Sequence, residues 1–310
     1  MHIAILGATS QIAQDFILSA EKESSYFFSL FARRPELVKA WVQRNDLKHI
    51  AEIVDFSAFD QRKHFDAIIN FVGVGNPAAA QIMGASILDI TAEFDSLALN
   101  YLRTYPETRY LFLSSGAAYG INFAEPVNEQ TTTIFNINNL REQDWYGIAK
   151  FYAEARHRSL AQLSIMDLRV FSYVSRHQDI HARFLLSDIL RAIQEKTTLR
   201  TSPDYIVRDF LHPSDFFQLI HSVLGAPATN TALDCYTRAP IDKPTLLSAM
   251  HDHFGLRYEI TDSSAGLNTT GGKPNYYSLN QRAAEFGYEP ALTSWDGILL
   301  ESSAVLGLQI

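Results

Sequence analysis

The sequence predicts an α/β fold built on a doubly wound parallel sheet. In the first half of the chain, short apolar runs alternate with segments whose apolar residues recur at helical spacing. Such alternation is typical of strand–helix–strand units, whose right-handed crossovers place helices on both faces of a parallel sheet. With 310 residues, 47% of them hydrophobic, the chain can bury a large core without disulfides or a metal.

Six apolar runs predict the strands of the first half. They lie at residues 3–6, 26–32, 51–54, 67–72, 110–113 and 165–171. Helical spacing between them, as in Ile12, Phe16 and Ile17, predicts the helices. These helices cover residues 11–20, a segment that starts at Pro35, and residues 87–105 and 145–163. Proline suits a first helical turn, because the N–H that it lacks has no helical partner there.

The second half alternates less regularly. It predicts helices over 183–196, 214–224 and 244–254, the last ending at Gly255, and a strand over 233–236. Residues 262–274 are rich in Ser, Thr and Gly and predict a loop. Ligands of doubly wound sheets bind at the carboxyl ends of the strands, so the candidate functional residues are those that follow each strand.

Composition and charge exclude several classes of function. The formal net charge is −8, so the chain lacks the basic excess that nucleic-acid binding requires. The single cysteine, Cys235, excludes a disulfide framework and a cysteine-based zinc site. No metal site is expected either, because the spacing of His157, His177, His181 and His212 is not that of metal ligands. No apolar run reaches roughly eighteen residues and no basic leader is present, so we expect a cytoplasmic protein without a membrane span.

The segment after the first strand is a candidate phosphate loop. Gly7 stands where a dinucleotide-binding fingerprint has its first glycine, and Ser10 and Ala13 hold its other two small positions. A glycine there allows a tight turn and lets a pyrophosphate approach the amino end of the helix. An ordinary strand-to-helix turn with one glycine is the alternative.

The end of the second strand carries Arg33 and Arg34 and no acidic residue. An acid at this position would bind a ribose 2′-hydroxyl, whereas arginine accommodates a 2′-phosphate. The pattern favours NADP, and the alternative is that the arginines simply begin a surface helix. Asp55, after the third strand, is a candidate partner of an adenine amine or a turn residue.

Two further motifs carry candidate chemistry. Ser114 and Ser115 end the fifth strand, and Tyr146 and Lys150 lie four residues apart on one face of a predicted helix. An ammonium close to a phenol stabilises the phenolate, which makes tyrosine a usable acid or base. A serine hydroxyl beside it can hold a substrate oxygen. A surface Tyr–Lys pair is the alternative for the helix motif alone.

Taken in order along the chain, these motifs resemble the extended short-chain dehydrogenase/reductase family, the NAD(P)-dependent nucleotide-sugar epimerases, dehydratases and reductases. The resemblance covers nearly all 310 residues. Its pieces are the loop at Gly7, residues 114–120, Tyr146 with Lys150, and residues 168–171, 208–212 and 285–290.

The resemblance implies a role for each matching residue. Tyr146 would be the general acid/base, Lys150 would lower its pKa and hold the nicotinamide ribose, and Ser115 would polarise the substrate oxygen. The implied cofactor-binding residues are Gly7, Thr9, Ser10, Gln11, Ile12, Arg33, Arg34, Asp55, Phe71, Gly73 and Lys150. Arg208 would grip the diphosphate of the nucleotide sugar, and a buried ion pair with Asp209 is the alternative.

The resemblance also implies an architecture. Residues 1–172 with about 211–237 would form the Rossmann domain, and about 173–210 with 238–310 the smaller α/β substrate-binding lobe. The helices at 87–105 and 145–163 would build a four-helix bundle in a homodimer. The loop at 73–77, marked by glycine and proline, would either cover the cofactor or form a turn.

Positions that differ from the family pattern reduce the number of activities that the resemblance allows. Gly116 and Ala117 stand where the 4,6-dehydratases carry Asp-Glu, which disfavours a dehydratase. Ser172 replaces an asparagine common at that position, which alters the substrate-contact pattern. The leading hypothesis is NADP-dependent reduction of a nucleotide-linked keto-sugar, and its alternative is an NAD-dependent nucleotide-sugar epimerase. A catalytically silent cofactor-sensing or scaffold protein is a third hypothesis.

Overall fold

The computed structural model describes residues 1–21, 25–59, 63–74, 80, 83–182, 184–261 and 273–308. The predicted loop at 262–274 falls mostly outside the described residues, as do residues 75–77 of the loop that begins at Gly73. No helix in the described part of the chain is long and apolar enough to cross a bilayer.

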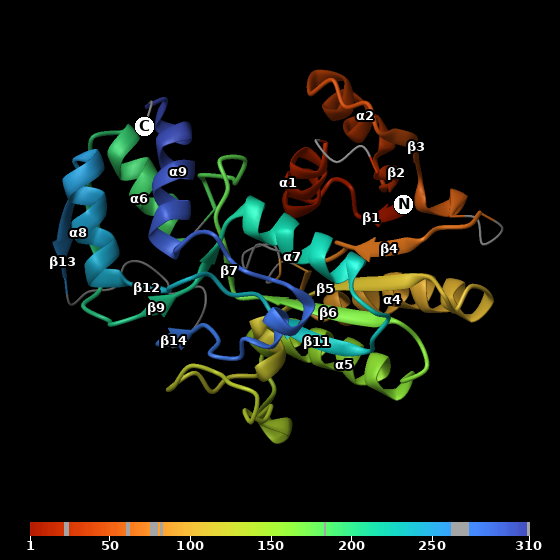
Figure 1. The fold of residues 1–310 in the computed structure, drawn as a ribbon. Coiled ribbons are helices and arrows are strands. Elements are labelled where there is room, and N and C mark those ends of the chain that lie inside the picture. The colour runs from red at the N-terminus through yellow and green to blue at the C-terminus, as the bar shows by residue number, and fades with distance from the viewer. Residues whose placement is uncertain are drawn as a thin grey trace.

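A seven-stranded parallel sheet forms the centre of the larger part of the molecule (Figure 1). Its spatial order is β11-β6-β5-β4-β1-β2-β3. The strands are β1 (His2–Leu6), β2 (Phe27–Phe31), β3 (Ile50–Val54), β4 (Ala67–Asn70), β5 (Arg109–Ser115), β6 (Ile165–Val170) and β11 (Thr231–Asp234). The strand order reverses between β1 and β4, and in such sheets ligands bind at the carboxyl ends of the strands beside this point. The predicted fold class is confirmed.

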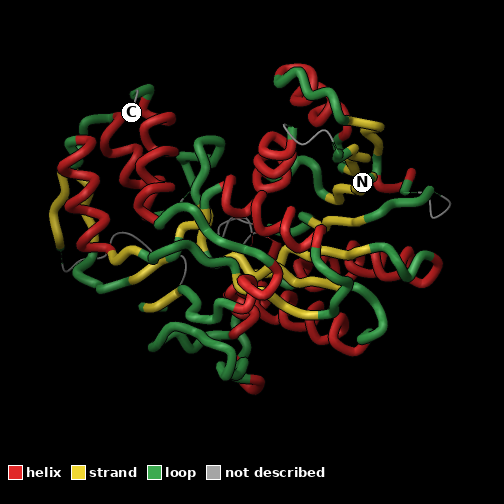
Figure 2. The backbone as a smooth tube through the Cα atoms, viewed as in Figure 1, coloured by secondary structure: helices red, strands yellow, loops and turns green. Residues whose placement is uncertain are grey.

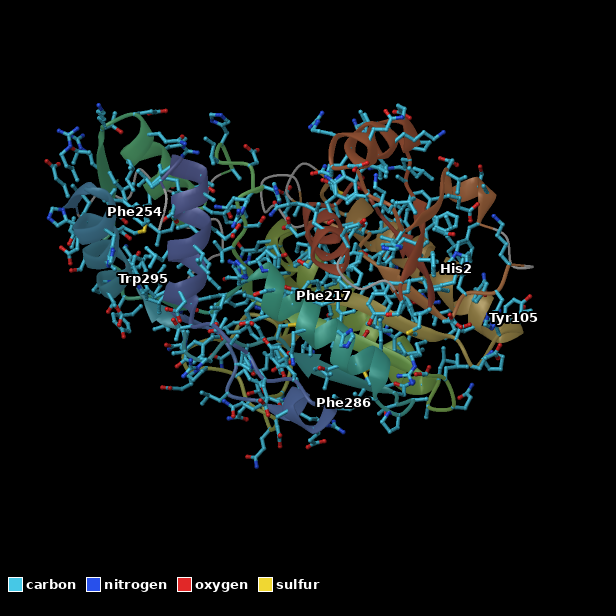
Figure 3. All side chains as sticks on the ribbon, turned by 45° about the horizontal axis from the view of Figure 1, so that its top comes forward. His2, Tyr105, Phe217, Phe254, Phe286 and Trp295 are labelled. Atoms are coloured by element: carbon cyan, nitrogen blue, oxygen red, sulfur yellow. The ribbon has the colours of Figure 1, made fainter. Side chains whose placement is uncertain are left out.

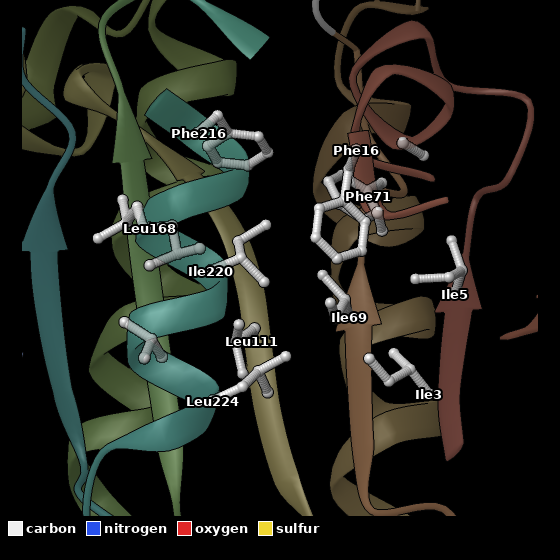
Figure 4. Close-up of a cluster of buried hydrophobic side chains, with 14 of the residues drawn as sticks. Ile3, Ile5, Phe16, Ile69, Phe71, Leu111, Leu168, Phe216, Ile220 and Leu224 are labelled. Carbon is white, nitrogen blue, oxygen red and sulfur yellow. The ribbon is translucent and has the colours of Figure 1, made fainter. Parts of the chain in front are cut away.

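Helices cover both faces of this sheet. One face carries α1 (Gln11–Ala20), α2 (Pro35–Arg44) and α7 (Pro213–Gly225), and the other carries α4 (Ser86–Thr104) and α5 (Trp145–Ser159). Side chains alternate along β1, so Ile3 and Ile5 pack toward α7 and α1 while Ala4 and Leu6 pack toward α4. Figure 4 shows the first of these layers, with Phe216 of α7 facing the strands.

A second lobe has its own small core. Its helices are α6 (Leu185–Gln194), α8 (Lys243–Phe254) and α9 (Ser294–Leu306). Its short strands are β7 (Ser172–Tyr173), β8 (Thr198–Thr201), β9 (Val207–Arg208), β10 (Phe210–Leu211), β12 (Ile241–Asp242), β13 (Arg257–Ile260) and β14 (Asn275–Tyr276). Figure 2 shows these short strands beside the three helices. Phe254 and Trp295 pack against the core of this lobe (Figure 3).

Several predicted elements end earlier than expected, and in two of them side chains bind the backbone at the end. The strand predicted to reach residue 72 ends at Asn70, whose Oδ1 accepts from the Val72 N–H at 2.9 Å and turns the chain. The helix predicted to reach residue 163 ends at Ser159. There the amide of Asn230 donates to the carbonyls of His157 and Leu160 at 2.9 and 2.8 Å.

Candidate active site

The carboxyl end of β5 meets the start of α5. Ser115 ends the strand and is followed by a 3-10 turn, η2 (Gly116–Tyr119), against which α5 packs. The approach is close: a Cβ on Gly147 would lie 2.7 Å from the carbonyl oxygen of Ala117. A glycine directly after Tyr146 therefore lets the helix bring that phenol to the serine.

Ser115 is buried, and Tyr146 lies half-buried close to it. Ser115 is 5% exposed, and its Oγ accepts from the Ala117 N–H at 3.2 Å. Burial raises the pKa of Tyr146, and a hydrogen bond with the Ser115 side chain opposes that rise. Unless another charge lies beside it, the Tyr146 phenol therefore keeps its proton at neutral pH.

Lys150 lies one helical turn beyond Tyr146 and is also buried. Its Nζ donates to the Leu113 carbonyl at 2.6 Å and lies 5.8 Å from the centroid of the Tyr146 ring. Burial lowers the pKa of Lys150 to about 8, against the attraction of Glu154. The lowering of the Tyr146 pKa by Lys150 that the resemblance implies stays a prediction, and burial acts in the opposite direction.

The predicted phosphate loop forms a tight turn between β1 and α1. Gly7 has a φ of +85°, and a Cβ there would lie 2.9 Å from the backbone nitrogen of Val72. Ser10 occupies the N-cap of α1, but its hydroxyl makes no capping bond. Thr9, Gln11 and the partly buried Ile12 flank this end of the helix. The turn therefore requires the conformational freedom of glycine at Gly7. The neighbouring start of α1 has no side-chain cap.

The other predicted cofactor residues lie at the same edge of the sheet. Arg33 and Arg34 are exposed after β2, and Arg34 is the N-cap residue of α2. Asp55 is exposed after the neighbouring strand β3 and accepts from the Ser57 N–H at 2.9 Å. That backbone hydrogen bond lowers the pKa of Asp55, so the residue serves as a cap in this structure.

The loop after β4 connects this edge to the catalytic candidates. Phe71 is buried, and its N–H donates to the Leu6 carbonyl at 2.8 Å. A Cβ on Gly73 would lie 3.4 Å from the Nζ of Lys150. The loop of the β1–β4 switch point therefore touches the lysine of the Tyr–Lys pair.

Arg208 reaches the site from β9 of the second lobe. It is 7% exposed, and its Nη1 donates to the carbonyls of Val207 and Lys273 at 2.8 Å each. Burial lowers its pKa to about 10. The Asp209 carboxylate accepts from the Thr237 N–H at 3.0 Å, from the Thr237 hydroxyl at 2.5 Å and from the Ser294 hydroxyl at 3.0 Å.

Sequence reasoning missed a buried network behind the site. Glu154 accepts from the Ser114 hydroxyl at 2.5 Å and binds the guanidinium of Arg169. Arg169 in turn donates to the Tyr119 hydroxyl at 2.7 Å, and Tyr119 donates to Asp234 at 2.9 Å. Glu154 lies four residues after Lys150, so helical spacing was the one signal that could have placed it here.

Tyr276 was also missed. Its hydroxyl lies 3.1 Å from Ser115 Oγ, although the two residues are 161 positions apart. Lys273 lies with its Nζ 4.9 Å from the centroid of the Tyr276 ring, and the Arg208 guanidinium lies 5.8 Å from it. No pattern in the sequence pointed to either residue.

Comparison with known proteins identifies a family for this chain. A model described as the NAD dependent epimerase/dehydratase family matches residues 3–236. Among curated proteins, none matches the chain.

Solved structures share its fold over almost the whole length. UDP-glucose 4-epimerase from Stenotrophomonas maltophila, with bound NAD and a formylated UDP-arabinopyranose, is 17% identical with a TM-score of 0.79, covering 99% of each chain. UDP-glucose 4-epimerase from Bifidobacterium longum, with NAD+ and UDP, is 17% identical with a TM-score of 0.76 over 98% of each chain. dTDP-glucose 4,6-dehydratase from Bacillus anthracis, with NAD, is 16% identical with a TM-score of 0.77, covering 99% of this chain and 96% of the other.

Proposed function

This chain belongs to the NAD-dependent epimerase/dehydratase family, and from that premise we propose that it is a nucleotide-sugar epimerase that uses bound NAD. The observation that carries the proposal is the meeting of Ser115 and Tyr146 at the end of β5, with Lys150 one turn further along α5. The absence of Asp-Glu after Ser115 argues against the dehydratase branch.

The residues around Gly7 fit a dinucleotide. The turn leaves no room for a Cβ, and the N-cap hydroxyl of Ser10 does not cover the start of α1, where a pyrophosphate binds favourably. Gly73 would bring the neighbouring loop to the same ligand, since it already lies against Lys150. When bound, the nicotinamide supplies a hydride acceptor and donor and, when oxidised, a positive charge that favours phenolate at Tyr146.

In this proposal the protein residues bind, orient and move protons. Tyr146 takes the proton of the sugar hydroxyl as the C–H bond is oxidised and returns it when the carbon is reduced on the opposite face. Ser115 donates to the same oxygen, and Lys150 holds the nicotinamide ribose. Arg208 grips the diphosphate, for which a guanidinium is well suited.

The test is a panel of UDP- and dTDP-sugars incubated with the protein and NAD, with epimer formation followed by NMR. Tyr146→Phe should lower kcat by about a hundred-fold or more, because it removes the proton donor, and should leave NAD binding nearly intact. Tyr152→Phe, an exposed residue of the same helix, is the matched control and should retain activity. Unchanged turnover by Tyr146→Phe would remove Tyr146 from the mechanism.

One observation favours a second function, NADP-dependent reduction of a nucleotide-linked keto-sugar. Arg33 and Arg34 follow β2 with no acidic residue beside them, a pattern suited to a 2′-phosphate. Protein that keeps oxidised NAD through gel filtration supports the epimerase. Stoichiometric oxidation of NADPH by a keto-sugar supports the reductase, and the double variant Arg33→Ala/Arg34→Ala should then weaken NADPH much more than NADH. If the protein binds the cofactor but converts no sugar, the result supports the third hypothesis, a catalytically silent cofactor-sensing or scaffold protein.

Two structural proposals accompany this function. Residues 1–172 with about 211–237 would be the NAD-binding domain, and the remainder the substrate-binding lobe with the cleft between them. The protein would be a homodimer through α4 and α5, where Phe151 and Tyr152 are exposed large side chains. Sedimentation equilibrium of Phe151→Glu, which places a charge on that face, would test the dimer.

A further inference from the structure

Tyr276 connects the second lobe to the centre of the candidate site. It lies on β14, where it pairs with Arg208 of β9. Its ring packs against Phe123 and Phe171 with centroid separations of 4.8 and 5.3 Å. The side chain is therefore held on several sides, with its hydroxyl 3.1 Å from Ser115 Oγ.

The groups around the Tyr276 hydroxyl decide which way its proton points. Burial raises the pKa of Tyr276 well above its ordinary range, so the phenol keeps its proton. The Ala117 N–H, close to the phenol oxygen, is a donor. The cations of Arg208 and Lys273 lie over the ring and offer the phenol proton no acceptor. Among the hydrogen bonds of the described residues, the Ser115 oxygen is the acceptor that remains for the Tyr276 proton.

The hydrogen-bonding capacity of Ser115 then follows. A serine hydroxyl has one proton and two acceptor lone pairs. The Ala117 N–H uses one lone pair and Tyr276 uses the other. The single Ser115 proton is left to be donated, and the Tyr146 hydroxyl lies close enough to the Ser115 side chain for the serine to lower the pKa of the tyrosine.

We propose that Tyr276 is a positioning residue that fixes Ser115 as a hydrogen-bond donor on the side of Tyr146, so that its single proton points to where the reacting oxygen would bind. The inference rests on the proposed function, since it concerns the same acid/base site. It assigns the second lobe a part in the chemistry besides substrate binding, because β14 carries the residue that orients a group on β5.

The consequence is a measurable effect on Tyr146. A serine fixed as a donor stabilises the phenolate, whereas a serine free to rotate does so for only part of the time. The charged and titratable groups that face this cluster are Lys150 on α5, Arg208 on β9, Lys273 and Tyr276 itself. Tyr276→Phe removes one neutral hydroxyl and leaves the charges of Lys150, Arg208 and Lys273 in place, so the change isolates the orientation of Ser115.

The experiment replaces Tyr146 by difluorotyrosine, whose more acidic phenol titrates within the pH range in which the protein stays folded. Fluorine NMR of the NAD-loaded protein then follows the ionisation of this phenol. Tyr276→Phe should raise the phenol pKa by about half to one unit, the size of one ordinary hydrogen bond. In the natural tyrosine enzyme the same variant should lower kcat about five-fold and leave KM within two-fold. Tyr277→Phe, the half-buried neighbour, is the matched control and should change neither quantity.

A double-mutant cycle separates orientation from a merely structural role. In a Ser115→Ala background, Tyr276→Phe should no longer shift the phenol pKa, because no serine proton remains to be oriented. An unchanged pKa in Tyr276→Phe alone, or an equal shift in both backgrounds, would overturn the proposal. The NMR titration needs no sugar substrate, so it tests the role of Tyr276 even if the proposed epimerase activity is not found.

Discussion

Lys150 holds its charge at a place almost closed to water. The residue is 3% exposed, and burial lowers its pKa to about 8, so it is mostly charged at neutral pH and neutral in alkaline solution. We predict that kcat/KM falls as the pH rises through about 8, because the ammonium loses its hold on the Leu113 carbonyl and the ribose. Lys150→Arg should move this alkaline limb to higher pH, since guanidinium stays charged. If Lys150→Arg leaves the alkaline fall of kcat/KM at the same pH, that fall belongs to the titration of another group.

His157 is a second buried cation, with Asp167 and Asp95 each 2.6 Å from one of its ring nitrogens. Desolvation lowers its pKa, but the two carboxylates prevail and raise it to about 9. A folded-state pKa above the ordinary value of 6.5 gives stability that is complete below pH 6.5 and is lost as the pH rises to about 9.

We therefore predict that the free energy of unfolding falls by about 2–3 kcal/mol between these two pH values in the native protein. His157→Gln, which cannot titrate, should lack this loss while being less stable at pH 6. Urea unfolding at a series of pH values measures both, and parallel pH curves for the two proteins would contradict the prediction.

Single residues were predictable from the sequence where the chemistry depends on local spacing. Tyr146 and Lys150 are four apart on one helix, and Gly7 follows a strand, so both motifs could be recognised. Tyr276 could not, because its partner Ser115 lies 161 positions away and only the fold brings them together. The buried charge of His157 could not be predicted either, because its acidic partners Asp95 and Asp167 come from α4 and β6.

At the scale of elements, α5 depends on one close contact with η2. The Cβ that Gly147 lacks would meet the Ala117 carbonyl oxygen at 2.7 Å and Phe135 at 3.4 Å. We predict that Gly147→Ala pushes the start of α5 away from Ser115, lowers kcat more than ten-fold and costs about 1–3 kcal/mol of stability. Gly225→Ala, at the end of α7, is the control, since nothing lies within 4 Å of its added Cβ. Activity measurements and thermal unfolding check both variants, and equal behaviour would show that α5 can accommodate the methyl group.

The elements that sequence patterns missed share a physical cause. α9 buries Glu301, Ser302 and Ser303 beside Ile298, so its inward face does not show an apolar period. The strands β9, β12 and β14 have two residues each, too few for alternation to be recognised. By contrast, α8 ends at Gly255 as predicted, because a left-handed residue (φ 70°) closes the helix.

At the scale of the whole molecule, buried charges join the two lobes. Asp234 at the end of β11 accepts from Tyr119 of η2 at 2.9 Å and from Ser278, which follows β14, at 2.5 Å. Glu301 of α9 makes the other junction: it binds the backbone and guanidinium of Arg176, and its Oε1 lies 3.2 Å from His212 Nε2, at the start of α7. Both junctions connect residues far apart in sequence, which is why neither could be predicted from motifs.

The Glu301 junction leads to a prediction for acid stability. Desolvation raises the pKa of this buried carboxylate, but hydrogen bonds from His212 and Arg176 prevail and hold it at about 2, below the ordinary 4.5. A lowered folded-state pKa gives stability that is present above pH 4.5 and is lost as the pH falls toward 2. We expect a contribution on the order of 2 kcal/mol, reduced from the full shift because Arg176 is half exposed to solvent.

Glu301→Gln should therefore be less stable than the native protein at pH 7, and the difference between the two should shrink as the pH falls below 4.5. Denaturant unfolding followed by tryptophan fluorescence suits the test, because Trp295 lies on the same helix as Glu301. Glu285→Gln, whose carboxylate is 68% exposed beside Arg282, is the control and should track the native protein at every pH. A constant difference between Glu301→Gln and the native protein from pH 7 down to pH 3 would mean that the junction acts through shape and not through charge. In that case acid would separate the two lobes no more readily than it unfolds the sheet.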